Sequence, residues 1–382
     1  MKSVRVVFTF LILLLSTTFV TADETSLSIG DKIVISGEGG LSFFHAGKEG
    51  DFKNNEFLVD EAKLFVEASL GAQTYFYSET NLLTREASDD HVEIGELYID
   101  FENLSRFWNS EGVLNVRVGR MDIPFGEEYL TRDAIDNPLI SHSITDFWGV
   151  DEGVEVYGAA RDLHYVLAIQ NGGIPKLHDF TSDKSVCGRV TYDLVQWLHL
   201  GFSAMRTGAL DPTDDVLSAL WFGNGFVRSL GSDATTSFRA NLYLVEGEFN
   251  WNDGHFTAGG GQLHYSDNDP NSNNDQTVSY YQFEAQERFI DGPRGKVYGA
   301  TRFGRISSPD GFPLAEHGDF GHFFFSPNAL TTSIWRLTAG LAYRPNANIL
   351  LKAEYTAERG TLLNGSKRNH EDFWGAEVAL KF

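Results

Sequence analysis

Apolar and polar residues alternate one by one in stretch after stretch of this chain. The pattern is clear in Lys32–Phe44, Glu61–Leu70, Glu96–Phe101 and Leu114–Gly119. Successive side chains of a β-strand point to opposite faces, so a period of two indicates strands with one apolar and one polar face. About sixteen such stretches follow one another along the chain.

The connections between these stretches alternate between short and long. Leu70–Gln73 and Asn252–Gly254 are short, whereas Arg120–Asp151 and Thr207–Thr236 are long and polar. Glu102–Gly112 is an exception, because a short turn is expected there. Tight turns at one end and long loops at the other are typical of outer-membrane barrels. We therefore predict an all-β, transmembrane antiparallel β-barrel of about 16 strands with short periplasmic turns and long external loops. The alternative is a secreted β-sandwich.

The two ends of the chain agree with an exported barrel. Met1–Ala22 has a basic start, an apolar run and small residues before Asp23, so we predict a signal peptide over 1–22 and a barrel over 23–382. The chain finishes inside a good strand, Phe373–Phe382. A barrel in lipid must pair its last strand with its first, because an open edge would leave backbone groups unsatisfied. The terminal strand is also similar to the assembly signal of bacterial outer-membrane barrels, carried here by Trp374, Val378, Leu380 and Phe382. The expected partners are outer-membrane lipid and the barrel-assembly machinery.

The polar faces of the predicted strands carry charges of both signs. With 53 acidic and 30 basic residues, the net charge of −23 argues against binding nucleic acid. A barrel of this size is wide enough to hold water, so inward charges predict a wet pore. The alternative is that these residues pair off as salt bridges in a plugged barrel. The predicted inward charges are Lys63, Glu67, Glu96, Asp100, Arg117, Glu155, Arg189, Arg239, Glu284, Arg302, Arg336, Lys352, Glu354, Glu377 and Lys381.

The long central loop begins with the most specific motif, GRMDIPFGEEYL at Gly119–Leu130. This motif resembles the phosphate-selective porin O and P family. The sequence patterns of three further stretches are also similar to that family: Val156–Gly173, Cys187–Asp193 and Arg336–Glu358. The resemblance implies that residues 120–151 fold into the channel and narrow it, and that the protein is a homo-oligomer, a trimer. Pro124 fixes φ and Gly126 permits a sharp bend, which suits a chain turning inward.

The charges of this loop do not suit a phosphate channel. Anion selectivity needs a basic constriction, whereas this loop is mostly acidic. We therefore expect modest cation preference, with a solvated external loop as the alternative. The candidate pore residues are Arg117, Arg120, Asp122, Pro124, Phe125, Gly126, Glu127, Glu128, Arg132, Asp133 and Asp136.

The sequence contains little that indicates chemistry. Ser141, His142, Ser143 and Asp146 are hydrolase residue types, but no nucleophile elbow surrounds them. We expect no catalytic residue, cofactor or metal. The predicted function is a porin, a passive channel for small hydrophilic solutes or ions. The alternatives are a channel specific for sugars or organic acids, with Tyr75 and Tyr77 as a stacking track, or a barrel that acts as an adhesin or enzyme.

Overall fold

A computed structural model describes residues 27–29, 32–48, 54–84, 92–172, 182–208, 220–222, 225–227, 238–267, 275–316 and 330–382. The predicted signal peptide, residues 1–22, lies outside these residues. In the described chain no helix is long and apolar enough to span a membrane.

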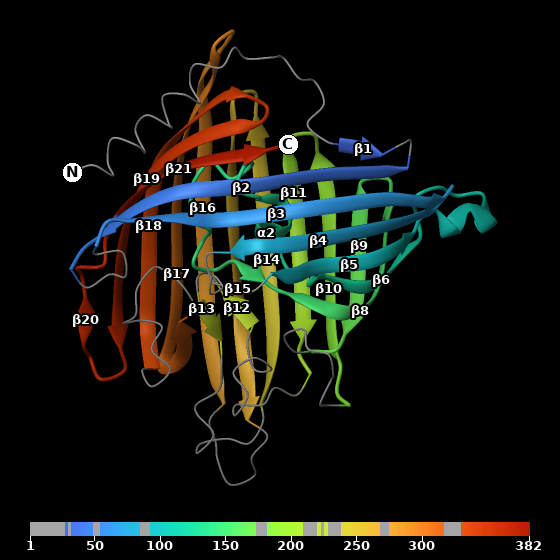
Figure 1. Ribbon diagram of the computed structural model, residues 1–382. Coiled ribbons are helices and arrows are strands. Elements are labelled where there is room, and N and C mark those ends of the chain that lie inside the picture. Colours follow the sequence, from blue (N-terminus) through green and yellow to red (C-terminus); the bar gives the residue numbers. More distant parts are fainter. Residues whose placement is uncertain are drawn as a thin grey trace.

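Sixteen long strands of the described residues form one closed antiparallel barrel (Figure 1), as predicted. The first eight are β2 (Ile33–Ala46), β3 (Glu56–Gly71), β4 (Thr74–Thr84), β5 (Glu93–Phe101), β6 (Asn115–Asp122), β8 (Val150–Ala160), β9 (Leu163–Gln170) and β10 (Ser185–Val195). The second eight are β11 (Leu198–Arg206), β14 (Phe238–Trp251), β15 (Gly254–Asp267), β16 (Gln276–Gly292), β17 (Gly295–Glu316), β18 (Leu330–Asn346), β19 (Ile349–Leu362) and β21 (Phe373–Lys381).

Each long strand pairs with the next one along the chain, and β21 pairs back with β2. In Figure 1, β2 to β5 cross the view whereas β14 to β17 run from top to bottom, because barrel strands tilt against the axis. The short elements are β1 (Leu27–Ile29), β7 (Phe147–Trp148), β12 (Leu220–Phe222), β13 (Gly225–Val227), β20 (Lys367–Arg368), η1 (Leu104–Trp108) and α2 (Glu128–Thr131).

The two ends of the barrel differ in the way the sequence predicts. Six connections at one end, which we call the turn end, are two residues long, and the seventh is the exception at 102–114 that holds η1. The longer connections all leave from the opposite end, the loop end. In an outer membrane the turn end faces the periplasm and the loop end faces the outside.

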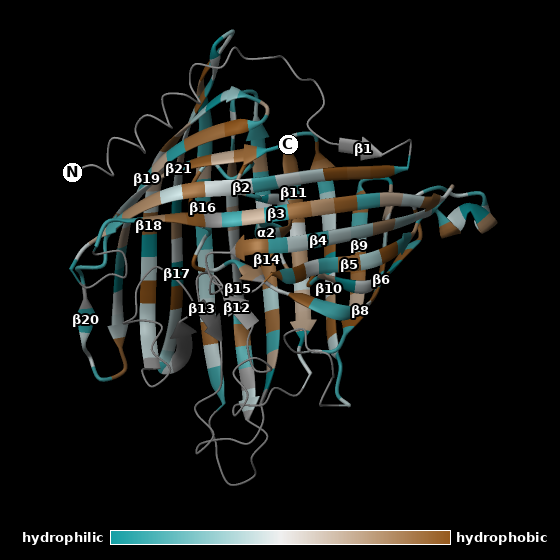
Figure 2. Ribbon diagram, viewed as in Figure 1, coloured by the Kyte–Doolittle hydropathy of each residue, from teal (hydrophilic) through white to brown (hydrophobic). Residues whose placement is uncertain are grey.

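The alternation of side chains along the strands is largely as predicted. Arg239 is an exception: it was predicted to face inward, but it shares the outward face of β14 with the exposed Tyr243 and pairs with Asp183. In β21, Trp374 and Leu380 are 43% and 38% exposed, whereas Glu377 and Ala379 between them are 3% and 0% exposed. Figure 2 shows the bands of opposite hydropathy that result along the strands. The exposed apolar side chains face away from the barrel, which is the arrangement that lipid requires.

Candidate functional site

The loop between β6 and β8, residues 123–149, lies inside the barrel and packs against its inner wall. Phe125, Ile144 and Phe147 are buried against Leu242 and Ile334 from the strands β14 and β18. Further along, the loop residue Ile140 packs on Phe44 and Phe373, and Ile135 packs on Leu350 and Ala379. The loop therefore covers the inner face of β14 to β21 and reaches β2.

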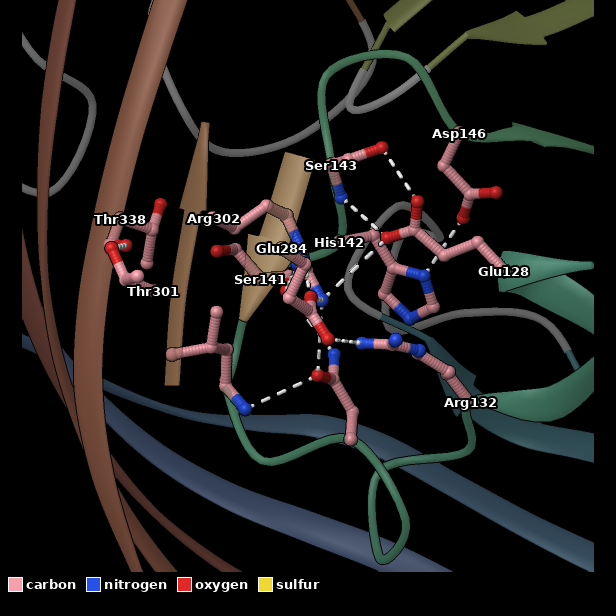
Figure 3. Close-up of polar contacts among 12 residues, drawn as sticks. Glu128, Arg132, Ser141, His142, Ser143, Asp146, Glu284, Thr301, Arg302 and Thr338 are labelled. Carbon is pink, nitrogen blue, oxygen red and sulfur yellow. Dashed lines mark hydrogen bonds and ion pairs between the residues drawn. The ribbon is translucent and has the colours of Figure 1, made fainter. Parts of the chain in front are cut away.

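A buried arginine on β17 fastens the middle of the loop to the wall (Figure 3). Arg302 is 4% exposed, and its Nε donates to Glu284 over 2.6 Å. Its Nη1 donates to the carbonyl oxygen of Ser141 over 2.5 Å, and Nη2 lies 3.7 Å from Glu128. Arg132 of the loop makes an ion pair with the same Glu284. Two arginines and two carboxylates therefore satisfy each other in a site that excludes most water.

A second set of contacts comes from β19. Lys352 Nζ donates to the carbonyl oxygens of Ala134 and Leu139 over 2.8 and 3.1 Å, and lies 2.6 Å from Glu377. Glu354 accepts from the backbone N–H of Ile140 over 2.7 Å. On this half of the wall the alternative interpretation is correct: the inward charges form salt bridges beneath the loop. Arg302, Lys352 and Glu377 are buried members of ion pairs and do not line a water-filled pore.

The hydrolase residue types lie in this loop, but they do not form a nucleophile pair. His142 Nδ1 is 2.8 Å from Asp146, whereas Ser143 Oγ donates to Glu128 over 2.6 Å. Ser141 Oγ is buried, and its backbone carbonyl accepts from Arg302. The serine hydroxyls therefore have no histidine base, and the arrangement fixes the loop.

Glu128, His142 and Asp146 each offer a ligand atom, all within 4.8 Å of one another, and no other such group occurs among the described residues. Ser143 and Arg302 already engage Glu128, which makes the site a poor one for a cation. Burial lowers the pKa of His142, but the hydrogen bond and charge of Asp146 outweigh it, so the pKa lies above 6.5. Burial and the charge of Glu128 raise the pKa of Asp146 to about 6. Burial also opposes ionisation of Glu128, yet Arg302 and Arg132 hold its pKa below 4.5.

The corner of the loop lies against β10 and β11. Gly126 has φ of +73°, which favours glycine, and its N–H donates to Ser203 Oγ over 3.1 Å. Arg189 donates to the carbonyl oxygen of Gly126. Pro124 and Phe125 before it are buried. Glu127 lies 3.0 Å from Nε2 of His199 on β11.

Carboxylates gather on the opposite side of the loop, where it faces β2 to β6. Lys63 lies 3.6 Å from Glu38 and 3.5 Å from Glu61, and it also interacts electrostatically with Glu79. Glu96 accepts from the N–H of Asp122 over 3.0 Å. We call this set the acidic arc; its members are Glu38, Glu61, Glu79, Glu96, Asp122 and the loop residue Asp133. Five of these carboxylates interact electrostatically with the ammonium group of Lys63, and the sixth, Glu96, interacts with Asp122.

The arc borders solvent inside the barrel. Asp133 and Thr131 are exposed although the apolar side chains of the same loop are buried. Asp133 makes no ion pair within the described part of the chain, whereas Asp136 lies 3.5 Å from Arg344. Glu79 and Glu96 are half-buried. The arc is therefore partly open to solvent on the side of the loop that faces β3 to β6.

The two predicted arginines of β6 face in opposite directions. Arg117 points inward, where it lies 3.2 Å from Asp100 and stacks over the rings of Tyr98 and Tyr157 at 4.2 and 5.1 Å. Arg120 shares its face with the exposed Leu97, its partner across the ladder, and lies 2.7 Å from Glu152. Arg120 is therefore on the outer surface, away from the lumen.

Four members of the arc are absent from the candidate pore residues: Glu38, Glu61, Glu79 and Glu96, of which only Glu96 was predicted as an inward charge. Their strands carry the right alternation, so their inward direction was readable from the sequence. What the sequence lacked was the path of the loop, which brings Asp133 next to Lys63 and Glu61. The residues proposed for assembly lie on or directly after β21, the strand that closes the barrel by pairing with β2; we call this pairing the seam. Trp374 and Leu380 are exposed outward, Val378 is half-buried, and Phe382 is 53% exposed.

Comparisons with known proteins identify the fold. No family model and no curated protein matches the sequence. The channel DcaP of Acinetobacter baumannii is 11% identical with a TM-score of 0.60, covering 94% of this chain and 100% of that one. OmpT of Vibrio cholerae in its trimer form is 9% identical (TM-score 0.57; 92% and 99% covered). An anion-selective porin of Comamonas acidovorans is 10% identical (TM-score 0.56; 91% and 98% covered). The chain thus has the fold of outer-membrane porins.

Proposed function

We propose that this protein is a passive diffusion channel of a bacterial outer membrane that prefers cations. The acidic arc carries the proposal, because its carboxylates gather inside the barrel beside the loop and several of them are partly exposed to solvent. Fixed charges in a narrow passage with low-dielectric walls attract counter-ions and repel co-ions. The porin-like fold and the seam of β2 and β21 support the location in an outer membrane.

Phosphate is a poor substrate for this lumen. A single lysine in the arc, Lys63, is already shared by Glu38 and Glu61. A phosphate would meet several carboxylates for each cation, so the resemblance to phosphate-selective porins extends to the loop motif and not to the selectivity. We also propose the trimer and the assembly machinery as partners, on that same resemblance.

The sugar-channel alternative is weakened by the aromatic side chains themselves. Tyr77 stacks on Tyr98 at 5.0 Å and on Phe65 at 6.3 Å, and the guanidinium of Arg117 lies 4.2 Å from the centre of the Tyr98 ring. Ring faces that are occupied by neighbours are not free to stack on a sugar.

The test is conductance across a planar bilayer. The purified, folded protein should give discrete ionic steps at nanomolar addition, and a heat-unfolded sample should give none. Folded protein that inserts without any step would favour an adhesin or an enzyme and overturn the proposal.

A further inference from the structure

A row of aromatic and basic side chains crosses four strands on the outer face of the barrel. The register places Tyr281 of β16 opposite Arg305 of β17, Arg305 opposite Trp335 of β18, and Trp335 opposite Arg359 of β19. Directly opposed residues of antiparallel strands share one face of the sheet. Tyr281 is 38% exposed, so the whole row faces outward. We call these four residues the rim row.

The rim row lies toward the loop end of the barrel. β16 begins at the loop end, and Tyr281 is near its start, while β18 and β19 connect at the turn end, far from Trp335 and Arg359. Below the row the outer face is apolar, with Leu337 and Leu341 exposed. Aromatic residues mark the interface of a membrane with water, so the row stands at the level of the external headgroups.

The rim row gathers basic charge on a chain that is acidic overall. The protein carries −23 overall, yet the rim row holds two arginines, and Lys367 of β20 lies opposite Thr361, two residues beyond Arg359 on the same face. The side chain of Arg359 forms an ion pair with Asp372, whereas the exposed side chain of Arg305 makes no ion pair or hydrogen bond in the described chain. On the opposite wall the outward Arg120 is neutralised by Glu152. Arg206 at the loop end of β11 is also exposed without an ion pair in the described chain, but the rim row brings two arginines and two aromatic rings together.

We propose that the rim row, with Lys367, binds the phosphorylated headgroup of a lipid in the external leaflet. Guanidinium groups bind phosphate through paired, charge-assisted hydrogen bonds, and basic groups beside a membrane span recognise anionic headgroups. Trp335 and Tyr281 hold the neighbouring acyl and sugar parts through their amphipathic rings. The inference rests on the outer-membrane location in the proposed function.

The experiment measures lipid retention by the folded protein. Native mass spectrometry counts the molecules of bisphosphorylated lipid A that remain on the wild type, Arg305→Gln, Arg305→Lys and the matched control Arg120→Gln. We expect Arg305→Gln to weaken binding about tenfold, Arg305→Lys to restore most of it, and Arg120→Gln to match the wild type. Dephosphorylated lipid A should bind no variant better than phosphatidylethanolamine.

Three results would overturn the inference. The first is equal lipid retention by Arg305→Gln and the wild type. The second is binding of dephosphorylated lipid A that equals binding of bisphosphorylated lipid A. The third is loss of the oligomer in Arg305→Gln with unchanged lipid retention, which would make the row a contact between copies of the chain. Conductance of the same variants separates the two proposals. Lipid binding without channel activity would contradict the proposed channel function only. Normal conductance without phosphate-dependent binding would contradict the proposed lipid site only.

Discussion

The backbone N–H of Gly37 donates to the carbonyl oxygen of Phe382, and the N–H of Phe382 donates back to Gly37, both over 2.9 Å. This reciprocal pair continues the β2–β21 ladder to the last residue of the chain. A Cβ on Gly37 would lie 2.6 Å from the Phe382 ring and 2.9 Å from the carbonyl oxygen of Lys63, so a larger residue would displace the ring and strain the β2–β3 ladder. The terminal residue is therefore part of the barrel closure.

Deleting Phe382, or changing it to Asp, should impair assembly, because the change removes the last ladder pair or places a charge on an exposed aromatic position. Heat-modifiable, folded protein in outer-membrane fractions is the readout. Phe382→Tyr is the control and should assemble normally. Wild-type amounts of folded Phe382→Asp protein would disprove this role.

Arginine on the outer face of the closing strand should destabilise the barrel. Val378→Arg should cost ~2–4 kcal/mol of unfolding free energy near the midplane, because it places a charge in lipid. Ser69→Arg, on the inward face near a turn, should cost far less. Urea unfolding in detergent or vesicles measures both. Equal costs would mean that the register is displaced by one residue.

The same experiment separates dry inward positions from wet ones. Glu377→Arg puts a cation beside Lys352, which lies 2.6 Å from the present carboxylate in a buried pair. Breaking such a pair costs about 3–5 kcal/mol. Glu67→Arg lies on the same inward face but is exposed, and it should be tolerated. A tolerated Glu377→Arg would contradict the packing of the loop on β19.

Removing the Arg302 side chain should loosen the loop. Arg302→Met leaves Glu284 and Glu128 without that cation and frees the carbonyl oxygen of Ser141, so we expect about 3–5 kcal/mol of destabilisation and a larger, noisier conductance. Arg288→Gln removes a half-buried arginine that pairs with Asp253 at the turn end, away from the loop, and serves as the control. Unchanged conductance in a folded Arg302→Met channel would show that the loop does not narrow the pore.

The pH dependence of the loop follows from three of its groups. The pKa of His142 is raised in the folded protein. Its contribution to the free energy of unfolding is therefore full below about pH 6.5 and is lost as the pH rises through the pKa of the folded state. Asp146, with its pKa raised to about 6, also favours the folded state less as pH rises from about 4 to about 6. Glu128, whose pKa is lowered, contributes above about 4.5 and loses its contribution in stronger acid.

The measurement is the difference in unfolding free energy between the wild type and His142→Gln. We expect it to be largest near pH 5 and to shrink by about pH 8, because the wild type alone loses the charged histidine. His142→Lys, which keeps the charge, should shift the decline to higher pH. A difference that grows with pH would contradict the assigned protonation.

The strands, their facing and the asymmetry of the two ends were predictable, because alternation and loop length are local properties of the sequence. Whether each inward charge is buried or exposed to solvent was not predictable, because that depends on the path of the loop inside the barrel. Glu377 and Arg302 are buried under the loop, whereas Glu79 borders solvent. Arg120 shows another limit: its motif placed it in the pore, but the register of β5 and β6 turns it outward. The closing strand was predictable from the alternation of apolar residues between Trp374 and Leu380, and it pairs with β2.

The account depends most on the acidic arc facing the open lumen. Its direct test is the reversal potential of the channel in a tenfold KCl gradient at neutral pH. The wild type should prefer cations, less so as salt approaches ~1 M, where the screening length is about 3 Å. The triple variant Glu79→Gln, Glu96→Gln and Asp133→Asn should move the reversal potential toward anions, and Glu111→Gln, in the connection that follows η1, should leave it unchanged. An anion-selective wild type, or a triple variant with the wild-type potential, would contradict the account.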